Sequence, residues 1–157
     1  MSERHNCYDY SFDVVDPAQI TVPNPRFHQP GGTKGLSSTL YRRGGRTCKN
    51  ISYLMRRDVP ELRRTTFGRR CPRGTSKIAM VADPDKDYHF YRQNRSGYWS
   101  HKDGQNDPKL YDANGAPIWD PRKAARDYRP NGARLNYSQF CGFYCAPRNK
   151  TIKLSRG

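Results

Sequence analysis

The 157-residue sequence lacks the long apolar run that a membrane-spanning segment requires. No stretch approaches the roughly 20 apolar residues that cross a bilayer. The first ten residues, MSERHNCYDY, also lack the apolar core of a signal peptide. We therefore expect a soluble chain that has no membrane span and is not secreted. In the reducing compartment that this location implies, free thiols are the default expectation for the five cysteines. The alternative is an oxidised scheme, in which the odd count leaves one cysteine unpaired, and Cys7 is the candidate for it.

Acidic residues are scarce as well, with 14 Asp and Glu against 29 Lys and Arg, which leaves a net charge of +15. The excess is concentrated in residues 42–73, where eleven Lys and Arg accompany only Asp58 and Glu61. Such a charge resists compaction unless an anionic partner compensates it, so we expect neighbouring protein chains with acidic surfaces. Nucleic acid is an alternative partner, although no known nucleic-acid-binding motif is present. Its phosphates would contact Arg42, Arg43, Arg56, Arg57, Arg63, Arg64, Arg69 and Arg70.

Closely spaced pairs of metal ligands are missing from the sequence. Its five cysteines and four histidines include no Cys-x-x-Cys pair and no His-x-x-x-His pair. Cys141 and Cys145 lie on one predicted strand, where a spacing of four residues is about 13 Å, too far for one ion or one disulfide. The sequence therefore predicts no metal site and no cofactor.

The length suits one domain, residues 1–157, with a small core that is rich in tyrosine. Asn6 is a favourable N-cap, which predicts a short helix that ends at Asp16-Pro17. An irregular loop rich in Pro and Gly follows at 17–37. Thr47 predicts the start of a second helix, which Pro60 ends.

The second half of the sequence changes to the period of two that is typical of strands. Residues 77–83 predict a buried strand, and DYHFYRQ with GYWSHK predicts a hairpin around residues 94–97. A further turn is predicted at Asn114-Gly115, and YSQFCGFYCA predicts a last strand before the basic tail at 146–157. Two helices followed by four to six antiparallel strands predict an α+β fold rather than a parallel α/β sheet.

Cys7 is predicted to lie in the first turn of the first helix. The positive end of a helix dipole lowers the pKa of a thiol toward the reactive range, which favours a nucleophile. The alternative is a small buried side chain that only fills space.

His89 and His101 lie on the two arms of the predicted hairpin. If its loop is centred on Arg95, the two residues are directly opposite each other, with Cβ atoms about 5 Å apart. An imidazole that faces a helix-borne thiol is the arrangement that a cysteine hydrolase requires. The alternative for His89 is a core position among its aromatic neighbours.

Several motifs resemble a family found in large DNA viruses and some bacteria. The motifs are NCYDY (6–10), QPGG (29–32), DYHFYRQNRSGYWSHKDG (87–104), DANGAPIWDPRKAARDY (112–128) and YSQFCGFYCAP (137–147), which spans the last predicted strand. A cysteine on the first helix and a histidine on a later strand also resemble papain-like and NlpC-type cysteine hydrolases.

The hydrolase resemblance implies a site in which Cys7 is the nucleophile and His101 the base. Asp112 or Asp120 would orient the base, and the backbone near Cys7 would form an oxyanion hole. The sequence departs from a reactive thiol in one respect, because Asp9 and Asp13 place negative charge near Cys7.

The resemblance implies a minor capsid protein, or another virion structural protein, of a large DNA virus, built on a cysteine-hydrolase-like scaffold. Its location would be the virion, and the host cytoplasm before assembly. One alternative is an active cysteine amidase or peptidase that uses Cys7 and His101. A weaker alternative is a nucleic-acid-binding virion protein. We prefer the structural role and leave catalysis open.

Overall fold

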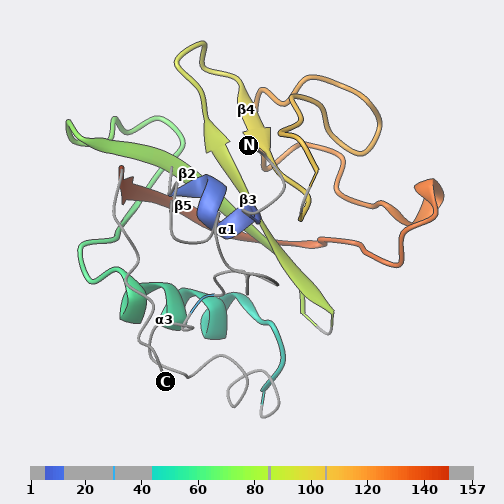
Figure 1. Ribbon diagram of the computed structural model, residues 1–157, viewed down its shortest axis with the longest axis horizontal. Helices are drawn as coiled ribbons and strands as arrows, with labels where there is room; N and C mark the ends of the chain where they lie inside the picture. Colours follow the sequence, from blue (N-terminus) through green and yellow to red (C-terminus); the bar gives the residue numbers. More distant parts are fainter. Residues whose placement is uncertain (1–5, 13–29, 31–43, 85, 105, 149–157) are drawn as a thin grey trace, which may run out of the picture.

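Five antiparallel strands form one sheet, in the order β1-β5-β2-β3-β4. The computed structural model describes residues 6–12, 30, 44–84, 86–104 and 106–148 (Figure 1). The strands are β1 (Arg63–Thr65), β2 (Thr75–Asp83), β3 (Asp87–Gln93), β4 (Trp99–His101) and β5 (Gln139–Pro147). The predicted α+β class and the predicted strand number are confirmed.

Two α-helices begin at the predicted capping residues. The Asn6 side chain accepts hydrogen bonds of 3.0 Å from the backbone amides of Tyr8 and Asp9, and so caps α1 (Cys7–Ser11). This helix ends at Ser11, with Phe12 as its C-cap, and is therefore shorter than the predicted helix that ends at Asp16-Pro17. Most of the predicted loop at 17–37 lies outside the described residues. Thr47 caps α3 (Cys48–Asp58) through a 3.2 Å bond from the amide of Asn50.

The alternation of side chains along the strands builds a core on each face of the sheet. On one face, α1 and α3 pack against the sheet, with Tyr8, Ile51 and Phe90 buried together. On the other face, Tyr91 and Trp99 pack with Ile118 from the irregular chain that follows β4. That irregular chain includes the short 3-10 helix η3 (Arg129–Asn131). It also includes the predicted turn at Asn114-Gly115, where the amide of Asp112 donates to the carbonyl of Ala116 at 2.8 Å.

The register of the β3–β4 hairpin differs from the prediction. His101 lies opposite Tyr91, so His89 is its diagonal neighbour rather than its direct partner. The Asn94 amide donates to the Tyr98 carbonyl at 2.8 Å, which centres the loop one residue later than expected. The two histidines still share a face, because a shift of two residues along a strand preserves the side.

Four of the five cysteines form two disulfides, so the prediction of free thiols is wrong. Cys48 of α3 bonds to Cys141, and Cys71 of the loop before β2 bonds to Cys145. The first bond joins residues 93 positions apart and the second joins residues 74 positions apart, so these cysteines become neighbours only in the folded sheet. Among the described residues Cys7 is the free cysteine, and it is buried.

Candidate functional site

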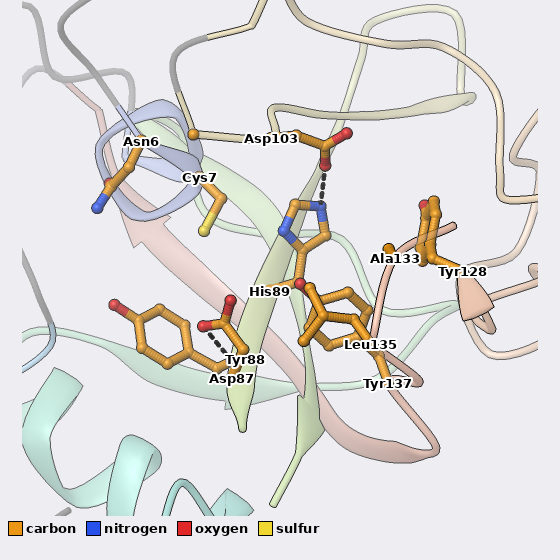
Figure 2. Close-up of a pocket in the computed structure, with 11 residues that line it drawn as sticks. Asn6, Cys7, Asp87, Tyr88, His89, Asp103, Tyr128, Ala133, Leu135 and Tyr137 are labelled. Atoms are coloured by element: carbon orange, nitrogen blue, oxygen red, sulfur yellow. Dashed lines mark hydrogen bonds and ion pairs between the residues drawn. The ribbon is translucent and has the colours of Figure 1, made fainter. Parts of the chain in front are cut away.

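A cavity of about 420 Å³ lies beside the start of α1 and the start of β3 (Figure 2). Each element contributes one potentially reactive side chain to the cavity wall: Cys7 from α1 and His89 from β3. The chain after β4 closes the other sides. The full lining is Asn6, Cys7, Asp87, Tyr88, His89, Asp103, Gly104, Tyr128, Ala133, Leu135 and Tyr137.

The Cys7 thiol is neutral in this environment. Burial raises its pKa well above the ordinary value, and the negative charges of Asp87 and Asp9 raise it further, while a hydrogen bond with the Phe90 backbone opposes them. The predicted effect of Asp9 is thus confirmed, whereas Asp13 lies outside the described residues. α1 has only five residues, and its dipole does not offset the burial of the thiol.

His89 and His101 form a hydrogen-bonded chain with a defined direction. Nε2 of His101 is 2.8 Å from the carbonyl oxygen of Tyr111, and Nδ1 of His101 is 2.8 Å from Nε2 of His89. Because a carbonyl only accepts, Nε2 of His101 donates, and its Nδ1 in the neutral ring is therefore an acceptor. Nε2 of His89 must then donate, which leaves Nδ1 of His89 without a proton. Figure 2 shows this nitrogen turned toward the Cys7 sulfur.

The His89 ring is neutral at ordinary pH. Burial and the neighbouring His101 lower its pKa to about 3, although the charge of Asp103 acts in the opposite direction. A neutral imidazole with an unprotonated Nδ1 is the form that accepts a proton.

Asp103 is a site residue that sequence reasoning missed. Its Oδ1 lies 3.4 Å from Nδ1 of His101 and 3.6 Å from Nε2 of His89, and its Oδ2 lies 2.6 Å from Nζ of Lys109. Burial opposes its ionisation, but the neighbouring imidazoles and the hydrogen bond from Lys109 together lower the pKa of Asp103. The signal was its spacing, two residues after His101, which returns the side chain to the same side of the chain.

The structure brings together only some of the predicted site residues. His89 faces Cys7 in Figure 2. His101 is fully buried, does not line the cavity and contacts His89 through a hydrogen bond, which is the orienting position. Asp112 instead accepts hydrogen bonds of 2.9–3.0 Å from the amides of Asn114, Ala116 and Ala125, and so shapes its own loop. Asp120 is paired with Arg122 at 2.8 Å. The catalytic roles themselves stay predictions.

His89, His101 and Asp103 also form a set of potential metal ligands. One donor atom of each lies within 4.8 Å of the others, and this is the one such group that the described residues contain. Two imidazoles and a carboxylate suit zinc or iron. The proton shared between the two facing nitrogens would have to leave before both could bind a metal ion.

The predicted basic region lies apart from the cavity lining. We call its exposed arginines the arginine segment: Arg56, Arg57, Arg63, Arg64, Arg69, Arg70 and Arg73. Arg64 donates to the carbonyl of Cys141 at 3.0 Å, while Arg42 and Arg43 lie outside the described residues. In the described parts of the chain, no helix has the length and apolarity to cross a membrane.

Comparison with known proteins finds one informative relative. The chain is 34% identical to the insoluble matrix shell protein 1 of Ruditapes philippinarum over 145 residues, which span 91% of this chain and 80% of that protein. No family model matches the sequence and no solved structure matches the fold, so the viral-family and papain-like resemblances stay predictions.

The relative corrects the predicted location. Its name describes an insoluble matrix protein of a shell, so the expectation of an intracellular virion protein, absent from secreted material, is wrong. The preference for a structural role agrees with the relative, whereas the viral capsid does not.

Proposed function

The chain belongs to the family of the insoluble matrix shell protein 1 of Ruditapes philippinarum, and we propose that it too is a structural protein of an insoluble extracellular matrix. The observation that carries this proposal is the extent of the similarity, which covers nearly the whole chain. The two disulfides support it, because such bonds persist in oxidising environments outside the cell.

Fractionation of the tissue that makes the protein tests this proposal. An antibody against the chain is expected to detect it in extracellular material that resists extraction with salt and detergent. Recovery of the bulk of the protein from the soluble cytosolic fraction would contradict the matrix role.

We further propose that the arginine segment binds acidic chains of the matrix. Its side chains are exposed. The whole chain has a net charge of +15, which favours an anionic partner that compensates this charge. Poly-glutamate is a suitable probe, and its affinity should fall steeply with added salt because exposed charges are screened.

A matched pair of double variants separates the arginine segment from general charge. Arg69→Gln/Arg70→Gln should weaken poly-glutamate binding by about ten-fold, on the order of 1.4 kcal/mol. Arg122→Gln/Arg129→Gln removes the same charge from arginines already paired with Asp120 and Asp127, and should have little effect. Equal loss in both variants would contradict a localised surface. Tighter binding to duplex DNA than to poly-glutamate at equal salt would instead favour the nucleic-acid alternative.

A second candidate function is acyl transfer or amide hydrolysis by Cys7. The observation that favours it is the directed chain from the Tyr111 carbonyl through His101 to His89, which leaves Nδ1 of His89 as a proton acceptor facing the thiol. Generic cysteine packing in a core does not require such a chain. In this arrangement His89 is the base and His101 positions it, which exchanges the roles predicted from the sequence.

The proposed step starts from the neutral thiol of Cys7 and the neutral ring of His89. The thiol proton passes to Nδ1 of His89 while the sulfur attacks an amide carbonyl carbon. The carbon–nitrogen bond then breaks, and the leaving amine takes the proton from the imidazolium. Water attacks the resulting thioester with help from the same nitrogen, and the thiol is restored as a carboxylic acid leaves. The Asp103 carboxylate, 3.6 Å from Nε2 of His89, stabilises the transient imidazolium.

Acetylation by p-nitrophenyl acetate tests this second function. Mass spectrometry should find the acetyl group on the peptide that contains Cys7, and His89→Ala should slow its formation by about 100-fold, the usual scale of general base catalysis. Asp107→Asn is the control, because Asp107 is exposed and does not line the cavity. Equal acetylation rates in the wild type and His89→Ala would contradict the assignment.

A further inference from the structure

The cavity carries the opposite charge to the rest of the chain. Its described lining contains two carboxylates, Asp87 and Asp103, and neither lysine nor arginine, whereas the whole chain has a net charge of +15. A ligand that enters this cavity therefore meets negative charge close to the thiol.

The negative charge of Asp103 is already compensated by Lys109, and its side chain is held in place. Its Oδ2 is 2.6 Å from Nζ of Lys109, and its Oδ1 faces the two imidazoles at 3.4 and 3.6 Å. These contacts assign Asp103 to the histidine pair rather than to a ligand.

Asp87 is differently placed, as the half-buried first residue of β3. Its Oδ1 accepts a 2.8 Å hydrogen bond from the Tyr88 amide, and Figure 2 shows the carboxylate facing the cavity on the same side as Cys7. Arg46 acts on it electrostatically, but that guanidinium donates to the Lys86 carbonyl at 2.8 Å and is not part of the cavity lining.

Aromatic walls complete the surroundings of Asp87. Tyr88 adjoins it, and Tyr137 stacks against His89 with ring centroids 5.3 Å apart. Tyrosine faces attract a cation, and the attraction grows where water is excluded. A desolvated carboxylate between such rings is complementary to an ammonium group on an aliphatic stem.

We propose that the cavity binds a primary ammonium group of the lysine type, with Asp87 as its anionic partner, and presents the neighbouring acyl carbon to Cys7. The volume of about 420 Å³ lies in the range of small-molecule sites and accommodates one lysine side chain with its flanking amides. The inference deepens the second candidate function and rests on it for the statement that the ligand is a substrate.

Calorimetry with two matched probes tests the binding site separately from catalysis. Cys7→Ala is used so that no acyl transfer occurs. Nα-acetyl-lysine amide should bind at least about ten-fold more tightly than the uncharged Nα-acetyl-norleucine amide, the scale of one charge-assisted hydrogen bond. Asp87→Asn, which retains an acceptor for the Tyr88 amide, should abolish this preference. Asp107→Asn, the same change at an exposed position outside the lining, should preserve it.

Equal affinity for the two probes, or a lysine preference that survives Asp87→Asn, would overturn the proposal. Binding that requires added zinc chloride and disappears with EDTA would also overturn it, because the acceptor would then be a metal held by His89, His101 and Asp103. A clear lysine preference without acetylation of wild-type Cys7 would confirm the binding site and reject the catalytic function, so the two failures are distinguishable.

Discussion

The arginine segment and the cavity differ in charge and in the way that cysteine is used. Both disulfides lie near the arginine segment, where Cys48 and Cys71 are bonded to β5. The cavity contains the remaining free cysteine, Cys7, and its shape depends on a helix cap and a chain of hydrogen bonds. The comparison indicates that the covalent cross-links and the free thiol occupy separate parts of this small domain.

The largest expected effect is on the disulfide side. Cys48→Ala/Cys141→Ala opens a link between residues 93 positions apart, and the free energy of unfolding should fall by about 4 kcal/mol. Urea denaturation at neutral pH measures the change. Cys7→Ala is the control from the cavity side, and should cost about 1 kcal/mol, the lost packing of one small side chain. A control that costs as much as the double variant would remove the distinction between the two regions.

The next effect ties the cavity to the pH dependence of stability. His89 titrates near 6.5 when unfolded and near 3 when folded, so the unfolded chain binds the extra proton between these values. Stability should therefore be complete above about pH 6.5 and fall as the pH drops, by up to about 1.4 kcal/mol per pH unit from this group. Asp103 adds to the loss only below about pH 4, because its folded pKa lies below the usual 3.8.

Urea denaturation at a series of pH values between 7 and 4 measures this slope. His89→Gln should flatten it, because the glutamine does not titrate. Arg69→Gln/Arg70→Gln, on the arginine segment, should leave it unchanged. An unchanged slope in His89→Gln would show that another group is responsible.

The smallest effect compares the two helix caps. Asn6→Ala and Thr47→Ala each remove a side-chain acceptor from a helix start, and each should cost about 1 kcal/mol. Only Asn6→Ala is expected to increase the alkylation rate of Cys7 by iodoacetamide, because fraying of the five-residue α1 exposes the thiol. Asn6→Asp keeps the acceptor and should restore the slow rate. Equally faster alkylation in Thr47→Ala would contradict a protection that is specific to α1.

Local patterns were sufficient for most of the secondary structure. Asn6 and Thr47 cap the helices at the predicted positions, and the apolar run of β2 and the last strand are confirmed. β1 was missed, because Arg63–Thr65 has no apolar alternation and becomes a strand only by pairing with β5. The hairpin register was displaced, because one hydrogen bond at Asn94 decides where the loop is centred.

The candidate site was predictable in its members more than in its arrangement. Cys7, His89 and His101 were recognisable as reactive residue types at suggestive positions. Asp103 was overlooked. Asp112 was given an orienting role, but its carboxylate is occupied by hydrogen bonds from three backbone amides of its own loop. The order of the two imidazoles depends on the Tyr111 carbonyl, a backbone atom whose position no sequence pattern specifies.

The sequence by itself determined the α+β class, the helix caps, the large positive charge and the presence of an isolated cysteine near the first helix. These properties depend on composition and on neighbours a few residues apart. Only the tertiary structure decided which cysteines pair, which histidine faces Cys7 and which carboxylate lies beside the imidazoles. Each of those outcomes depends on distances between residues far apart in the chain. Such distances are set only when the strands pair and a core packs on each face of the sheet.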